Sequence, residues 1–99
     1  MTEAKLTLKC VRRLRAAGAF VSKIHGGPRQ SSGLPDIVGC YRGLFFGIEM
    51  KMPGKENTLT EKQAEKLDKI REAGGIAVVA TSVRDCLDVL ARIDEYHGD

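Results

Sequence analysis

The sequence predicts one α/β domain in which a mixed sheet is flanked by helices, with the elements in the order α-β-β-β-α-β-α. Three observations support this. Apolar residues recur at helical spacing near both ends of the chain and once between them, and residues 33–51 alternate as a two-stranded hairpin. A continuously apolar run at 76–80, with a helix on either side, is typical of a buried strand parallel to its neighbour. A chain of 99 residues is the size of one domain, residues 1–99.

Composition narrows the class of protein. A hydrophobic content of 42% with 29% charged residues is ordinary for a soluble globular chain, and disorder is disfavoured. There is no apolar run of membrane-spanning length and no secretory leader, so we expect a cytoplasmic protein without membrane contact. The net charge of +3 is too small to indicate nucleic-acid binding by itself. Three cysteines without a C-x-x-C pair predict buried free thiols rather than a zinc site, namely Cys10, Cys40 and Cys86.

Residues 2–17 are expected to form the first helix, with Thr2 as N-cap and Gly18 as its end. Its apolar stripe contains Leu6, Cys10, Leu14 and Ala17, and Glu3 falls on the same stripe. Glu3 has two interpretations. An acidic residue in the first turn complements the helix dipole, or it leans into a nearby site.

The opposite side of this helix carries four cations with no acid between them: Lys5, Lys9, Arg12 and Arg13. Such a face is either ordinary solvated surface or a contact for the DNA backbone, and both interpretations stay open here. A strand is expected at 19–25. The irregular stretch 26–33 that follows is either a plain connection or a phosphate-contacting loop, with Arg29, Gln30 and Ser31 as donors.

The hairpin at 33–51 is the centre of the functional argument. Ile37 to Tyr41 and Leu44 to Lys51 are β-prone, and Arg42-Gly43 is a plausible two-residue turn. With that turn, Tyr41 pairs with Leu44, and Asp36 pairs with Glu49 on the same face, with β-carbons about 4.5 to 5.5 Å apart. Lys51 points the same way as Glu49. Two carboxylates at that distance repel unless a cation joins them, and oxygen ligands suit Mg²⁺.

After the hairpin, 52–59 is expected to be a loop in which Lys55 contacts either DNA or water. Thr60 and Gln63 fit a capping box that opens a helix ending near Ala73. Gln63 also shares a face with Leu67 and Ile70, so it either completes the cap or serves the site; one rotamer is expected to fill only one of these roles. A strand at 76–80 and a final helix, capped by Thr81 or Ser82, complete the chain. Its apolar stripe is Val83, Cys86, Leu87, Leu90 and Ile93.

Pro35-Asp36 followed by Glu49-Met50-Lys51 resembles the signature of the PD-(D/E)xK nucleases. With Gly33 before it and Gln63 opening the next helix, the run resembles the virus-type replication-repair nuclease (VRR-NUC) branch, in element order over nearly the whole chain. The resemblance implies a restriction-endonuclease-like core and a Mg²⁺- or Mn²⁺-dependent endodeoxyribonuclease. It implies metal ligation by Asp36, Glu49 and the backbone carbonyl of Met50. Lys51, Gln63 and Glu3 would complete the catalytic set.

The substrate follows less directly. No helix-turn-helix or zinc finger is present, so selection by DNA shape is favoured over sequence. The resembled family includes small stand-alone phage and prophage proteins. Resemblance to these members implies a homodimer that acts on branched DNA such as Holliday junctions. The apolar positions of the last helix are candidates for a dimer interface. Two other interpretations remain: a non-catalytic DNA-binding module, and a small α/β domain in which Glu49 and Lys51 form only an ion pair.

Overall fold

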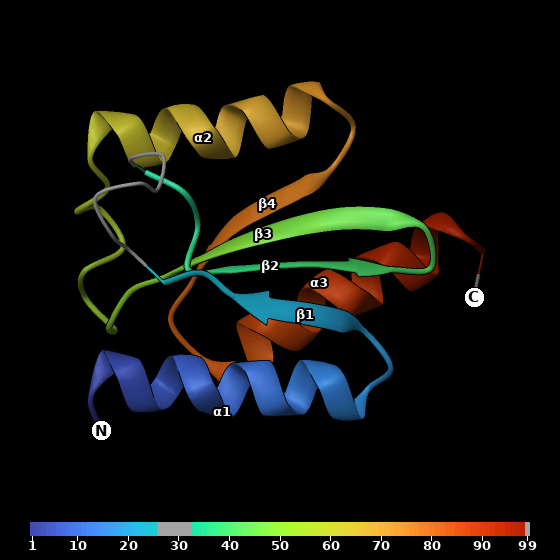
Figure 1. Cartoon of the computed structure of the whole chain (residues 1–99), viewed down its shortest axis with the longest axis horizontal. Helices are drawn as coiled ribbons and strands as arrows, with labels where there is room; N and C mark the ends of the chain where they lie inside the picture. Colours follow the sequence, from blue (N-terminus) through green and yellow to red (C-terminus); the bar gives the residue numbers. More distant parts are fainter. Residues whose placement is uncertain (26–32, 99) are drawn as a thin grey trace.

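The computed structural model describes residues 1–25 and 33–98, and its elements follow the predicted order. Helix α1 spans Glu3–Ala16, strand β1 Phe20–Lys23, β2 Ile37–Tyr41, β3 Leu44–Met50, helix α2 Glu61–Glu72, strand β4 Ile76–Ala80 and helix α3 Val83–Tyr96. Figure 1 shows the four strands as one sheet with helices on both of its sides. The predicted mixed α/β architecture is therefore confirmed.

The sheet has the strand order β1-β2-β3-β4. The first three strands are antiparallel, and β4 joins β3 in parallel after the crossover through α2. Lys51, just beyond β3, continues this pairing, because its amide donates to the carbonyl of Ala80 at 2.9 Å. The carboxyl ends of β3 and β4 therefore lie at the same edge of the sheet.

A tight turn sets the register of the β2–β3 hairpin. Arg42 and Gly43 have φ values of 51° and 85°, and positive φ at both central residues is the requirement of a type I′ turn. The turn pairs Tyr41 with Leu44, and the ladder continues to the pair Ile37 and Ile48. The next step outward brings Asp36 opposite Glu49, which is the register that the sequence predicted.

Helices α1 and α3 cover one face of the sheet, and the hydrophobic core lies between them and that face. The core contains Cys10 and Leu14 of α1, Phe46, Ile48 and Met50 of β3, and Cys86, Val89, Leu90 and Ile93 of α3. The apolar residues of the last helix therefore stabilise the monomer, and their candidacy for a dimer interface is wrong. Among the described residues, no helix is long and apolar enough to span a membrane.

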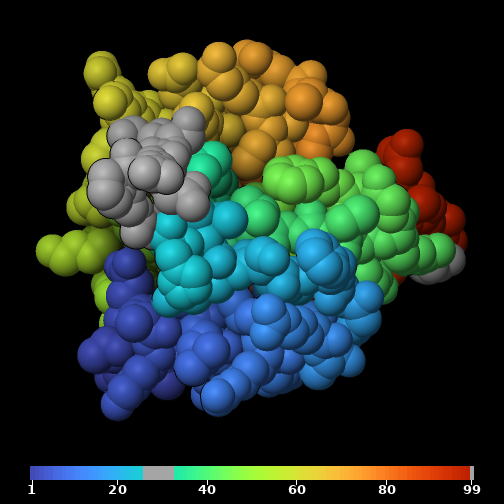
Figure 2. Space-filling view, viewed as in Figure 1, coloured from blue at the N-terminus to red at the C-terminus, as the bar shows by residue number. Residues whose placement is uncertain are grey.

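Helix α2 covers only part of the other face. Its Ile70 packs over Gly47, and its Leu67 is 1% exposed. Farther along the same face, the cross-strand neighbours Phe20, Cys40 and Phe45 remain exposed. Figure 2 shows the strands at the surface between α2 and α1. The prediction that all three cysteines are buried is therefore wrong for Cys40, because strand alternation assigns it to the face that α2 leaves partly open.

Smaller boundary differences have local causes. Strand β1 is shorter than the predicted 19–25, since its ladder with β2 covers only Phe20 to Lys23. Ala17 is exposed because α1 has already ended at Ala16, while Thr7 and Val11 are buried instead. The buried stripe of α1 is thus rotated slightly from the one inferred from helical spacing.

Candidate active site

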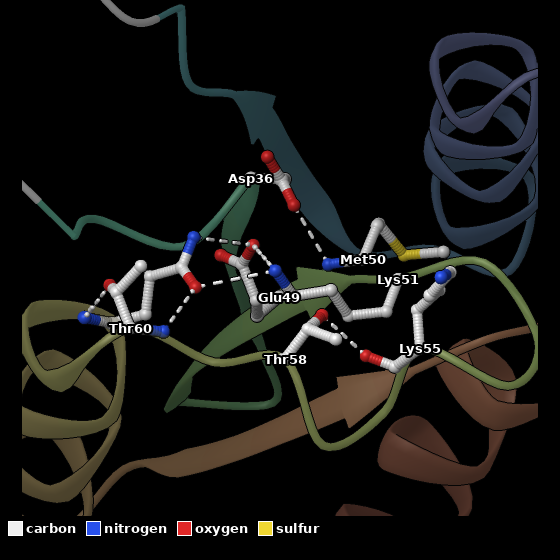
Figure 3. A network of polar contacts seen from close by, with 8 residues as sticks. Asp36, Glu49, Met50, Lys51, Lys55, Thr58 and Thr60 are labelled. Atoms are coloured by element: carbon white, nitrogen blue, oxygen red, sulfur yellow. Dashed lines mark hydrogen bonds and ion pairs between the residues drawn. The ribbon is translucent and has the colours of Figure 1, made fainter.

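Four predicted site residues meet where the hairpin ends against the first turn of α2. Asp36 immediately precedes β2, Glu49 lies in β3, Lys51 follows β3, and Gln63 lies in α2. Figure 3 shows Asp36, Glu49 and Lys51 close together, with Asp36 bonded to the main-chain amide of Met50. The fold thus brings together residues that are far apart in the chain.

Asp36 is held by both its main chain and its side chain. Its carbonyl oxygen accepts from the amide of Ile24 at 2.8 Å, which extends the β1–β2 pairing. Its carboxylate Oδ2 accepts from the amide of Met50, also at 2.8 Å (Figure 3). The side chain therefore spans the hairpin to the residue beside Glu49, and its orientation does not depend on a ligand.

Glu49 is a buried carboxyl, with only 4% of the residue exposed. Burial raises its pKa to about 8, and the charge of Asp36 and a hydrogen bond to it act in the same direction. The ammonium of Lys51 lowers the pKa, but not enough to offset these causes. Near neutral pH and without a bound cation, Asp36 and Glu49 together therefore carry less than two negative charges.

Gln63 serves the helix cap and the site at the same time. Its main-chain amide donates to Thr60 Oγ1 at 3.1 Å, and its Oε1 accepts from the amide of Thr60 at 3.0 Å, completing the capping box. The same Oε1 accepts from Lys51 Nζ at 3.3 Å, while Nε2 donates to Glu49 Oε2 at 3.2 Å. The expectation that one rotamer fills only one role is wrong, because the two ends of the amide point to different partners.

Lys51 lies between the carboxylate and the amide. Its Nζ is 4.0 Å from Glu49 Oε2, and its side chain is 14% exposed. The distance to Glu49 is longer than a direct hydrogen bond, so the closer partner of the ammonium is Gln63. The ammonium is held at the site and still reaches solvent, as a group that meets a substrate must.

Glu3 is exposed, which corrects its placement on the buried side of α1. It is the first residue of the helix, before the stripe becomes covered, and Thr2 caps this end by accepting from the amide of Lys5. The charge of Glu3 nevertheless contributes to the raised pKa of Glu49. Glu3 therefore lies near enough to add negative potential at the site without touching it.

The oxygen donors at this position fit a divalent cation. Within residues 1–25 and 33–98, no group of three or more His, Cys, Asp and Glu side chains gathers as a metal cluster. The acceptors are instead the two adjacent carboxylates of Asp36 and Glu49, whose oxygen atoms are of the kind that Mg²⁺ and Mn²⁺ bind. The raised pKa of the buried Glu49 marks an electrostatic conflict that a bound cation would remove.

The predicted DNA-contacting residues fall into two groups. Lys5, Lys9, Arg12 and Arg13 of α1 and Lys55 of the loop after β3 are exposed. Arg29, Gln30 and Ser31 lie outside the described residues.

Gly33 has a role that the sequence did not reveal. It adopts φ +84°, and a β-carbon there would lie 2.4 Å from the main-chain carbon and oxygen of Lys62. Only glycine allows the chain before Pro35 to pass this close to the first turn of α2. The glycine of the signature therefore brings the hairpin and the capping box together.

No family model matches the sequence, and no curated protein matches it. Two solved structures resemble the fold over most of its length. One, described as a "VRR_NUC domain protein", aligns with a TM-score of 0.73 at 19% identity, covering 92% of this chain and 86% of the other. A second, described as a "VRR_NUC domain", gives 0.70 at 22% identity, covering 90% and 94%. The predicted architecture is thus confirmed: this chain shares the fold of these two VRR_NUC structures.

Proposed function

We propose that the protein is a metal-dependent endonuclease that hydrolyses phosphodiester bonds in DNA. The observation that carries the proposal is the network of Asp36, Glu49, Lys51 and Gln63 at one end of a VRR-NUC fold. A structural ion pair alone does not explain it. An ion pair between Glu49 and Lys51 needs no second carboxylate, yet Asp36 lies beside Glu49 and, together with burial, raises its pKa.

In the proposed mechanism, Asp36, Glu49 and the carbonyl of Met50 would hold Mg²⁺ or Mn²⁺. When bound, the cation would lower the pKa of water and neutralise charge that builds on the phosphate. The main-chain amide of Met50 fixes Asp36 and the Gln63 amide fixes Glu49, so both carboxylates are oriented before the cation arrives.

Lys51 and Gln63 act on the reacting phosphate. The Lys51 ammonium donates hydrogen bonds toward the phosphate oxygens or the attacking water, at a place where burial strengthens each charge interaction. Gln63 orients that ammonium through Oε1. Glu3 contributes negative potential at the cation from the first turn of α1. The product ends implied by the resemblance are a 5′-phosphate and a 3′-hydroxyl.

The exposed cations give the DNA backbone a path to this site. Lys5 and Lys9 lie on the half of α1 that includes Glu3, and Lys55 lies in the loop directly after Lys51. These side chains bind phosphates without reading sequence. We therefore propose selection by DNA structure, with branched DNA such as a Holliday junction as the preferred substrate.

We further propose that two copies associate through the open part of the sheet. Phe20 is 73% exposed and Phe45 is 45% exposed, on the face that carries Glu49. Beside Phe45 lies a hollow of about 410 Å³ lined by Pro35, Ile70 and other residues of α2 and its flanks. A two-fold contact here would place two sites near one interface, which suits a junction with two symmetric strands to cut.

Replacing Phe20 with glutamate is expected to weaken dimerisation at least about tenfold, because a charge would be buried in the apolar contact. Tyr96→Glu is the matched control: Tyr96 is 75% exposed but belongs to the end of α3. Sedimentation velocity over a concentration series measures the effect. A wild-type protein that stays monomeric throughout, or equal dimerisation by both variants, contradicts the proposed interface.

The function itself is tested with end-labelled four-way junction, flap, duplex and single-stranded DNA, each in Mg²⁺, Mn²⁺ or EDTA. We expect cutting in either metal, none in EDTA, and preference for the junction over the duplex. Binding without cutting in both metals would replace the nuclease by a DNA-binding module. Neither binding nor cutting would leave only the fold.

A further inference from the structure

A second hollow adjoins the candidate site on the other side of β3. Its volume is about 450 Å³, within the range of roughly 300 to 1,000 Å³ that small-molecule sites occupy. Its walls come from the start of α1, the loop after β3 and the first turn of α3. The lining residues are Met1, Leu6, Lys9, Met52, Pro53, Thr81, Ser82, Val83 and Arg84.

Chain connections place this hollow beside the reacting groups. Met52 directly follows Lys51 and alternates to the opposite side of the strand. Thr81 directly follows Ala80, whose carbonyl accepts from the Lys51 amide at 2.9 Å. In Figure 1, the beginning of α1 and the loop after β3 lie at the same end of the molecule, where the hairpin terminates. The hollow and the reacting groups are therefore connected through adjacent residues at one end of the sheet.

The lining combines two chemistries. Leu6, Met52 and Val83 supply apolar surface, and methionine sulfur makes favourable contacts with aromatic rings. Lys9 and Arg84 are exposed cations that contribute to the lining. Apolar walls beside two cations complement a nucleotide, whose base is a flat ring and whose phosphate is an anion. The hydroxyls of Thr81 and Ser82 already bond to Asp85, so they are engaged within the protein.

We propose that this hollow receives one unpaired nucleobase of the DNA strand that crosses the active site, with Lys9 and Arg84 contacting the adjoining phosphates. The inference rests on the proposed nuclease function and deepens it. In continuous duplex the base is paired and stacked, and extracting it costs free energy, whereas at a branch point, where regular stacking is interrupted, that cost is smaller. Occupation of the hollow would therefore favour branched over duplex substrates without any residue that reads sequence.

The test combines DNA that lacks one base with a protein in which one side chain lining the hollow is shortened, each change alone and both together. Affinity is measured for a four-way junction and for the same junction with an abasic site at each nucleotide flanking the cleaved bond. The protein carries Lys51→Ala to prevent cutting. We expect one abasic position to weaken binding about tenfold, in keeping with the contribution of a single base to stacking affinity. In Met52→Ala, the same abasic site should cost less than about threefold.

The rim has its own matched pair. Arg84→Ala should weaken junction binding, whereas Arg92→Ala, an exposed arginine of α3 outside the hollow, should not. The abasic measurement on the parent needs no wall variant, so a poorly folded Met52→Ala does not leave the question open. Equal affinity for intact and abasic junctions at every position overturns the inference, and so does an undiminished abasic penalty in folded Met52→Ala. Cleavage by the wild-type protein is recorded in parallel, so failure of the nuclease and failure of the base site are told apart.

Discussion

Lys51→Ala is expected to reduce DNA cleavage by about 10² to 10⁴-fold while leaving the protein folded. The range is that for removing one proton-transferring or charge-stabilising group from an active site. The folded state should persist because, among the described residues, the ammonium contacts Glu49 and Gln63 at the edge of the core. Single-turnover cleavage of the junction in Mg²⁺, with a thermal melt of each protein, measures both quantities.

Lys55→Ala serves as the control, because Lys55 has the same charge and lies four residues on, in the exposed loop. It should retain cutting within a few fold and lose affinity instead. Asp36→Ala and Glu49→Ala should behave as Lys51→Ala does, with normal dimerisation. If all three variants cut at the parent rate, the site has been assigned wrongly.

The metal-free protein is expected to lose stability as the pH rises from about 4.5 to about 8. Glu49 has its usual pKa near 4.5 when the chain is unfolded and about 8 in the folded state. Across this window the unfolded chain releases the proton and the folded protein keeps it, so unfolding becomes progressively more favourable. The loss in unfolding free energy should be on the order of a few kcal/mol, and it should level off above the folded pKa. Urea titrations in EDTA at several pH values measure it.

Glu49→Gln should remove most of this slope, because the amide does not titrate and fills nearly the same volume. Asp85 and Asp94 have lowered pKa values, caused mainly by hydrogen bonds from Thr81 and Arg42 respectively, so they contribute only at more acidic pH. Adding Mg²⁺ or Mn²⁺ at pH 8 should restore stability to the parent and not to the variant. A parent whose stability is flat from pH 5 to pH 8 would contradict the raised pKa.

The sequence predicted the hairpin register well because local rules determine it. Once Arg42-Gly43 is the turn, pairing brings Asp36 opposite Glu49 without any tertiary information. What covers each face of the sheet is a tertiary property, and strand alternation alone does not indicate it. This is why Cys40 was expected to be buried and why apolar residues of α3 that lie in the core were considered for a dimer interface.

The site shows the same division. The residue types and the spacing of Asp36, Glu49 and Lys51 predict the chemistry, and the geometry supports the proposed site. The dual role of Gln63 escaped prediction because it depends on which way an amide points, and that is decided by a helix whose position the hairpin does not specify. The steric need for Gly33 depends on the same helix, since its neighbours belong to the first turn of α2.

The capping box has a consequence for how this protein responds to heat. At a helix N-terminus, Ser, Thr, Asp and Asn can each serve as the cap residue. Here the cap shares an atom, Gln63 Oε1, with Lys51. Fraying of the first turn of α2, an ordinary thermal fluctuation, would therefore also release the ammonium and the amide that steadies Glu49. With the proposed function, heat should therefore reduce activity before it unfolds the domain, because one side chain, Gln63, serves both the helix cap and the Lys51 contact.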